Sequence, residues 1–137
     1  MAEKTLFIVK PDAVAAHRTG AIIARIEAEG FEVVALRRLR LTAQQAESFY
    51  AVHRQRPFFA GLVRFMTQGP VVAGVLAADN AIAGYRALMG ATDPAKAEEG
   101  TLRRAFGRDI ENNAVHGSDA PETARFEIGH FFAGCDL

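Results

Sequence analysis

Thr5-Leu6-Phe7-Ile8-Val9 is the stretch of this sequence that decides the fold. It is an almost entirely apolar run, and it ends at Lys10-Pro11-Asp12, where the proline has no N–H group to donate to a β-ladder. A short, continuous apolar run of this kind predicts a strand buried on both faces at the centre of a sheet. Lys10 is then expected to emerge at the end of that strand.

The other predicted elements give the order of strands and helices. Strands are expected over 31–41, 71–77 and 114–116. Helices are expected over 20–29, 42–53, 58–66, 80–89 and 120–132. The first ends at Gly30, the second begins with a capping box of Thr42 and Gln45, and the third follows Pro57. The fourth is capped by Asp79 or Asn80, and the last begins with a capping box of Asp119 and Glu122. Residues 90–113 are expected to be irregular, with a possible helical turn at 101–106.

This order predicts the fold class. If residues 42–66 are an insertion, the chain runs strand, helix, strand, strand, helix, strand and terminal helix. That is the α+β, ferredoxin-like split βαβ sandwich, a four-stranded antiparallel sheet with helices on one face plus additional helices. The topology alone does not indicate a function.

Composition limits the class of protein. The 137 residues are expected to form one domain, 1–137, and 16 basic against 16 acidic residues give a net charge of +0. No overall field therefore favours nucleic acid as a main partner, or a membrane surface. Cys135 is the single cysteine, so no intramolecular disulfide can form. With no signal-like or membrane-spanning apolar segment, the chain is expected to be cytoplasmic.

His116 is the first candidate for chemistry. It lies in Asn113-Ala114-Val115-His116-Gly117-Ser118-Asp119, between a short apolar run and a turn that leads into a helix. A neutral imidazole can act as a nucleophile and carry a covalent intermediate. Taken alone, a histidine beside a turn is more often simply a hydrogen-bonded structural residue. Motifs for P-loop, dinucleotide-binding, hydrolase and zinc sites are absent from the sequence.

Several other polar residues stand where apolar or neutral ones are expected. Glu127 borders the apolar stripe of the last helix and either orients His116 or Ser118 or is an exposed edge residue. Arg86 lies on the stripe of its helix and either meets an anion or extends to water. Arg103 could be an ordinary surface charge, and Thr92 could be a turn residue. Tyr50 and His53 form either a polar pair or a solvated helix face. Phe58 is either a core residue or a platform on which a base stacks.

Six collinear segments make the chain resemble the nucleoside diphosphate kinase family, from about residue 4 to 132. They are Lys10-Pro11-Asp12, Arg56 to Leu62, Gly69 to Val72, Gly90-Ala91-Thr92-Asp93-Pro94, Gly100-Thr101-Leu102-Arg103 and Asn113 to Asp119. The resemblance implies a ping-pong exchange in which His116 takes the γ-phosphoryl group of a nucleoside triphosphate, mainly ATP, and passes it to a ribo- or deoxyribonucleoside diphosphate.

The resemblance also implies the roles of the site residues. The residues that would contact phosphates and ribose are Lys10, Tyr50, Arg86, Thr92, Arg103 and Asn113, with His53 nearby. Phe58 would stack on the base. Glu127 and Ser118 would orient the His116 ring. Lys10 and Tyr50 would also belong to the catalytic set. Mg²⁺ would be held by nucleotide phosphates with no direct protein ligand, and the chain would form a homo-oligomer, a tetramer or hexamer, or else a dimer.

The chain departs from the family pattern at two places. Residues 108–112 precede the asparagine where the family usually has Gly-Arg, and Ala120 stands where serine is frequent. The alternative function is a nucleotide-binding regulatory protein with vestigial catalysis. The intact set of Lys10, Arg86, Arg103, Asn113 and His116 argues against it.

Overall fold

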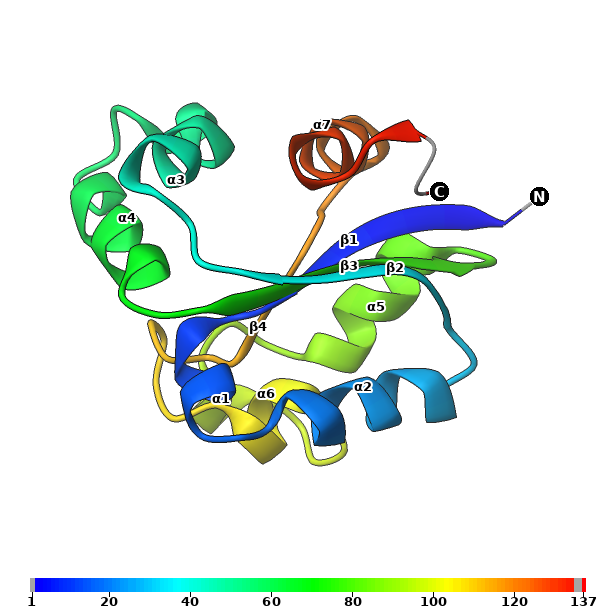
Figure 1. Cartoon of the computed structure of the whole chain (residues 1–137). Helices are drawn as coiled ribbons and strands as arrows, with labels where there is room; N and C mark the ends of the chain where they lie inside the picture. The colour runs from blue at the N-terminus through cyan, green and yellow to red at the C-terminus, as the bar shows by residue number, and fades with distance from the viewer. Residues whose placement is uncertain (1, 135–136) are drawn as a thin grey trace.

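The structure is a computed structural model that describes residues 2–134 and 137, so Cys135 lies outside the described residues. Figure 1 shows the arrangement of the elements. In chain order they are β1 (Glu3–Val9), α1 (Pro11–Ala15), α2 (Thr19–Ala28), β2 (Glu32–Leu39), α3 (Ala43–Phe49), the 3₁₀ turn η1 (Ala51–His53), α4 (Phe59–Thr67), β3 (Val71–Ala78), α5 (Ala81–Met89), η2 (Pro94–Lys96), α6 (Leu102–Phe106), β4 (Val115–Gly117) and α7 (Pro121–Phe131).

The sheet has the predicted topology. Its four strands lie in the order β2-β3-β1-β4, and every neighbouring pair is antiparallel. β1 is therefore central, and Ile8 pairs with Ala73 of β3 on one side and with His116 of β4 on the other. The ferredoxin-like α+β fold is confirmed, and it places His116 on a short edge strand beside the central strand β1, whose last five residues are buried.

Helices cover both faces of this sheet, which explains why the β1 segment is apolar without alternation. α2 and α5 lie on one face, while α3, α4 and α7 lie on the other (Figure 1). Phe7 and Val9 belong to the core on the α2 and α5 side, and Leu6 and Ile8 belong to the core on the opposite side. Complete burial of an aliphatic side chain contributes about 1.5–3 kcal/mol relative to exposure, so both cores stabilise the strand.

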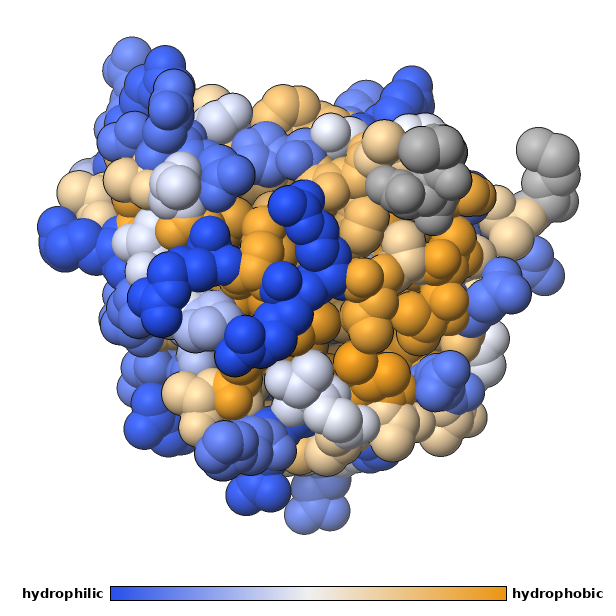
Figure 2. Space-filling view, in the orientation of Figure 1, coloured by the Kyte–Doolittle hydropathy of each residue, from blue (hydrophilic) through white to orange (hydrophobic). Residues whose placement is uncertain are grey.

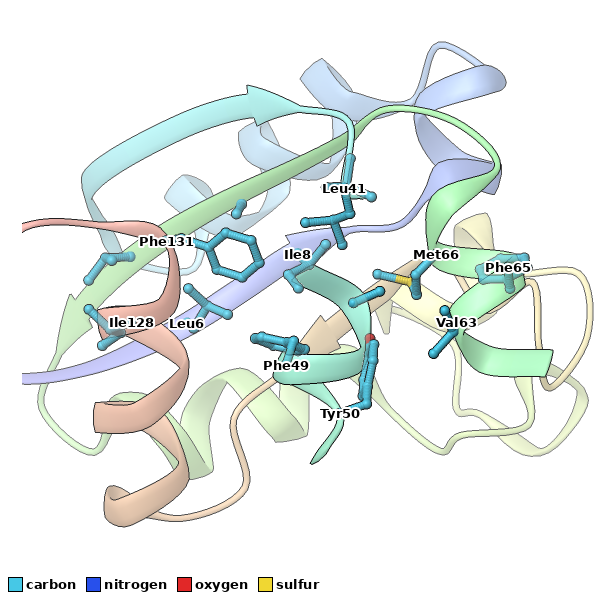
Figure 3. Close-up of a cluster of buried hydrophobic side chains, with 14 residues drawn as sticks. Leu6, Ile8, Leu41, Phe49, Tyr50, Val63, Phe65, Met66, Ile128 and Phe131 are labelled. Atoms are coloured by element: carbon cyan, nitrogen blue, oxygen red, sulfur yellow. The ribbon is translucent and has the colours of Figure 1, made fainter. Parts of the chain in front are cut away.

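The core on the α3, α4 and α7 side leads directly to the candidate site. Phe49 and Tyr50 project from the end of α3 towards Leu6 and Ile8, and Phe131 of α7 closes the cluster from the other direction (Figure 3). The Phe49 ring packs 4.9 Å from the Tyr50 ring and 5.3 Å from the Phe131 ring, measured between centroids. Tertiary packing thus fixes the position of Tyr50.

Two predicted helix ends are confirmed. The Thr42 hydroxyl accepts from the backbone N–H of Gln45 at 3.1 Å, and the Gln45 side chain accepts from the N–H of Thr42 at 2.9 Å. Gly30 follows α2 with a φ of +96°, the left-handed conformation that glycine adopts without strain.

The predicted cap of the last helix was wrong. Asp119 and Glu122 do not form a capping box, because Pro121 occupies the first helical position and shifts the start of α7 by one residue. The Thr123 hydroxyl instead accepts from the N–H of Ala120 at 3.0 Å and donates to Asp119 Oδ1 at 2.7 Å. The Asp119 carboxylate therefore remains beside the His116 strand.

α5 is capped from a distant part of the sequence. Asn80 occupies the N-cap position with a φ of +55°, but its side chain makes no capping hydrogen bond. Glu3 Oε1 accepts from the N–H of Ile82 at 2.9 Å and takes that role. Two further differences are the short helix α1, which begins at Pro11 and was not predicted, and the helix expected to reach residue 53, which ends at Phe49 before a 3₁₀ turn.

Gly90 gives a prediction about stability. It ends α5 with a φ of +83°, and a Cβ atom there would lie 2.7 Å from the Cβ of Thr101. Gly90→Ala therefore combines backbone strain with overpacking, and we expect it to lower the free energy of unfolding by about 2 kcal/mol or more. Urea denaturation measures this loss; Gly20→Ala, where a Cβ meets nothing within 4 Å, is the matched control and should change it far less.

Candidate functional site

A cavity of about 380 Å³ opens beside His116, between η1, α5, α6 and α7. Its lining brings together side chains from segments far apart in the sequence. The lining residues are Phe49, Tyr50, Val52, His53, Arg86, Met89, Thr92, Arg103, His116, Gly117, Asp119, Thr123 and Glu127.

His116 is held by a glutamate on α7. The Nε2 atom of His116 lies 3.0 Å from Glu127 Oε1, and the side chains are 23% and 13% exposed. Glu127 is therefore not the exposed edge residue that the sequence left open. The His116 ring also packs 5.5 Å from the Phe49 ring in an edge-to-face arrangement, which limits rotation of the imidazole.

Ser118 fixes the direction of this contact. The backbone N–H of Leu6 donates to Ser118 Oγ at 3.3 Å, and the Ser118 hydroxyl donates to Glu127 Oε1 at 2.7 Å. Glu127 Oε1 thus accepts from the hydroxyl, and an ionised carboxylate also accepts from His116. Nε2 then carries the ring proton, and the lone pair of the neutral imidazole resides on Nδ1.

Cationic groups line the opposite wall of the cavity. Arg103 donates to the backbone oxygen of Gly90 at 3.1 Å and to that of Val115 at 3.0 Å. Burial lowers the pKa of Arg103, as does the nearby charge of Arg86, with Tyr85 opposing. Arg86 itself is exposed along the cavity. The site therefore presents one guanidinium anchored by the backbone and one free to meet an anion.

Lys10 lies beside this cavity and outside its lining. Its Nζ atom donates to Asn113 Oδ1 at 2.8 Å and to the backbone oxygen of Glu111 at 3.0 Å. Asn113 in turn donates to the backbone oxygen of Thr92 at 3.1 Å, and Thr92 lines the cavity. Burial lowers the pKa of Lys10 to about 8, although the Asp12 carboxylate raises it. Lys10 is thus a cation that loses its proton at about pH 8, well below the usual range of a lysine.

Three aromatic side chains stand at the η1 side of the site. Tyr50 is buried, and its burial, followed by the charge of Glu127, raises the pKa of its hydroxyl. His53 lines the cavity, and its ring lies 5.4 Å from the Phe58 ring. Phe58 is 53% exposed and is not a core residue. Its exposed face is available to a flat ligand.

The predicted site residues fall into two groups. The cavity lining contains His116, Glu127, Tyr50, His53, Arg86, Thr92 and Arg103. Asn113, Ser118 and Phe58 contact lining residues from behind or from the rim, and Lys10 lies one step further away, on Asn113. The sequence reasoning missed Phe49, Val52, Met89, Gly117, Asp119 and Thr123. Only Gly117 and Asp119, which lie within the His116 motif, carried a signal that could have found them.

Two features are absent from residues 2–134 and 137. That part of the chain contains no cluster of three or more histidine, cysteine, aspartate or glutamate side chains that could hold a metal ion. None of its helices has the length and apolar character needed to span a bilayer.

Comparisons with known proteins identify the family of this chain. The family model described as nucleoside diphosphate kinase matches residues 3–137. A nucleoside diphosphate kinase of Acidiphilium cryptum is 59% identical over 98% of this chain and 96% of its own length, and one of Bradyrhizobium diazoefficiens is 56% identical over the same shares.

Solved structures of nucleoside diphosphate kinases share the fold of this chain. The Aquifex aeolicus nucleoside diphosphate kinase has a TM-score of 0.97 at 45% identity, covering 100% of this chain and 99% of its own. A halophilic nucleoside diphosphate kinase from Halobacterium salinarum in complex with CDP has a TM-score of 0.95 at 40% identity, covering 100% and 91%. With a family match over nearly the whole length and a shared fold, this chain belongs to the nucleoside diphosphate kinase family.

Proposed function

We propose that His116 carries the phosphoryl group in the reaction of this family. The activity itself, phosphoryl transfer between nucleoside tri- and diphosphates, follows from family membership. ATP is proposed as the main donor, and ribo- and deoxyribonucleoside diphosphates as acceptors. The observation that carries the assignment is the Nε2 contact with Glu127, because it leaves the Nδ1 lone pair of a partly exposed ring for attack on the γ-phosphorus.

Both halves of the reaction use the same atoms. A bond forms between His116 Nδ1 and the γ-phosphorus as the bond to the β–γ bridging oxygen breaks, and the diphosphate leaves. Glu127 stabilises the positive charge that develops on the ring. An oxygen of the incoming diphosphate then attacks the phosphorus, and the P–N bond breaks in the reverse sense. Phosphoryl transfer needs mainly positioning and charge stabilisation, which Arg86 and Arg103 are placed to supply.

The remaining predicted residues complete the proposed nucleotide site. Lys10, Tyr50, Thr92 and Asn113 would contact phosphates and ribose. Phe58 would stack on the base with His53 nearby, and stacking without contacts to base edges predicts broad tolerance of bases. The relative bound to CDP supports a nucleotide site in this fold.

The metal is proposed to enter with the substrate. Kinases need a divalent metal to neutralise phosphate charge, and family membership extends that need to this chain. Mg²⁺ is proposed as that ion. Phosphate oxygens would hold it without a direct protein ligand, and its charge would assist the two arginines.

A labelling experiment tests the ping-pong route. Incubation of the protein with γ-labelled ATP should leave an acid-labile label, and addition of GDP should chase the label into GTP. Nucleotide binding without a phosphoenzyme would instead favour the alternative of a regulatory protein with vestigial catalysis. Nothing in the comparisons supports that alternative.

The wider context of the chain is also a proposal. We propose that residues 1–137 act as one nucleoside diphosphate kinase domain in the cytoplasm, without nucleic acid as a main partner. A homo-oligomer, a tetramer or hexamer or else a dimer, is proposed because the outer edge of β2 has no pairing strand among the described residues. In Figure 2 the face that carries β2 shows a hydrophobic band beside a hydrophilic ridge.

Leu36 on this edge gives a prediction about assembly. It is 51% exposed, and a glutamate there would place a charge in any contact made through β2. We expect Leu36→Glu to shift the protein to a smaller species in analytical ultracentrifugation. The matched control is Phe126→Glu, which changes a side chain that is 50% exposed on α7 and should leave assembly unchanged. A wild-type protein that sediments at its monomer mass of 14.8 kDa contradicts the proposal.

Lys10 gives a prediction about pH. Below pH 8 the free protein holds Lys10 charged, so the ammonium is ready for phosphate; above pH 8 binding must first recover a proton. Affinity for ADP should therefore fall as pH rises, approaching roughly tenfold per pH unit well above the free-protein pKa. Calorimetry between pH 7 and 10 measures this. Lys10→Met should bind more weakly with a nearly flat profile, and a flat wild-type profile rules out the role.

A further inference from the structure

The residue before the His116 strand has an unusual backbone. Ala114 has a φ of +74° and is completely buried, although alanine disfavours this region. The N–H of Val115 donates to the backbone oxygen of Asn113 at 2.9 Å, so the chain makes a three-residue turn centred on Ala114. A γ-turn with a positive central φ is rare and strained, and strain of this kind persists only where the surroundings impose it.

Two contacts from the start of the chain impose this turn. Asp12 Oδ2 accepts from the N–H of Ala114 at 3.1 Å, and the N–H of Lys10 donates to the oxygen of Ala114 at 2.8 Å. Both polar groups of one strained residue are therefore bound by Lys10 and Asp12, at the end of β1 and the start of α1, which lie beside the chain entering β4 in Figure 1. The Lys10 contact uses the backbone, so among the described residues Asp12 supplies the only side-chain hydrogen bond to Ala114.

The turn lies between the groups that the proposed reaction needs. Asn113, on one side of Ala114, binds Lys10 Nζ and the oxygen of Thr92. On the other side, Val115 accepts from Arg103, and His116 follows. A change in the φ of Ala114 would rotate these two sides relative to each other, and small errors in the position of reacting atoms reduce rates strongly.

We propose that Asp12 is a positioning residue for His116, whose carboxylate holds the strained turn at Ala114 and thereby sets where the His116 strand begins. The proposal rests on His116 being the phosphorylated residue, as inferred above. Asp12 is not among the residues that line the cavity and acts through the backbone. Burial raises the pKa of the Asp12 carboxyl group, whereas the charge of Lys10 and hydrogen bonds from backbone amides lower it. Lys10 and these amides are therefore the partners of the carboxylate charge.

Single-turnover phosphorylation by γ-labelled ATP at saturating concentration tests the proposal. Asp12→Ala should lower the rate at least about tenfold, because nothing replaces the bond to Ala114. Asp12→Asn keeps an oxygen that can accept the N–H group of Ala114. Its phosphorylation rate should therefore stay within about threefold of the wild-type rate at pH 6, where Lys10 is charged.

A rescue variant distinguishes positioning from general damage. Glycine adopts a φ of +74° without strain, so Asp12→Ala combined with Ala114→Gly should recover much of the lost rate. The matched control is Glu3→Ala, which removes a carboxylate that binds a backbone N–H at the start of α5 and should leave the rate within about twofold. A melting curve of each variant establishes that it is folded.

Three results would overturn the proposal. They are a folded Asp12→Ala variant that reacts at the wild-type rate, an Asp12→Asn variant that is as slow as Asp12→Ala, and a double variant that reacts no faster than Asp12→Ala. If Asp12→Ala does not fold, the double variant and Asp12→Asn carry the test. Failure of the proposed function is separate, because wild-type protein would then acquire no label on His116.

Discussion

His116→Ala should abolish phosphoryl transfer while the protein stays folded. The side chain is only partly buried and its backbone pairs in β4, so the loss of the ring leaves the sheet hydrogen bonds intact. Removal of a nucleophile that forms the covalent intermediate should lower kcat by about 10³-fold or more. A coupled assay that follows GTP formation from ATP and GDP measures the loss.

A second histidine provides the control. His17 is exposed with a φ of +62°, and asparagine tolerates that conformation. His17→Asn should retain wild-type transfer and the acid-labile label, whereas His116→Ala should show neither. Transfer at a substantial rate by the His116 variant would refute the assignment of the nucleophile.

Glu127→Gln should have the second largest effect, because it removes the negative charge beside the reactive ring. Glu127 Oε1 accepts from both the Ser118 hydroxyl and His116 Nε2. A glutamine whose amide oxygen takes the place of this one atom still accepts both hydrogen bonds, so Nε2 keeps the ring proton. The variant lacks the negative charge that stabilises the imidazolium. We expect the phosphorylation rate to fall about 10²-fold or more.

The measurement separates this effect from binding. Single-turnover phosphorylation should slow while the dissociation constant for ADP stays within about threefold, because Glu127 faces the ring and its role is to orient it. Nitrogen chemical shifts of the imidazole should show that the ring proton of the variant is still on Nε2. Glu122→Gln, on the exposed first turn of the same helix, is the control and should match wild type. Phosphorylation of the Glu127 variant at the wild-type rate would contradict the explanation.

The local rules of the sequence were reliable where one segment decides its own structure. The apolar run at Thr5–Val9, the Thr42 capping box and Gly30 all behave as predicted, since each depends on neighbours within a few residues. The errors arose where a distant group or a proline intervenes. Glu3 caps α5 across the fold, and Pro121 displaces the start of α7.

The sequence by itself determined the strand order and the family, and it supplied the residues proposed to carry the chemistry, because these depend on periodicity and on motifs that lie within short segments. Only the tertiary structure decided which nitrogen of His116 faces Glu127, that Lys10 lies behind Asn113, and that Asp12 holds the turn at Ala114. Those contacts join residues up to 103 positions apart in the chain. Their geometry is set by the packing of both cores on the sheet, and no periodicity within a segment specifies it.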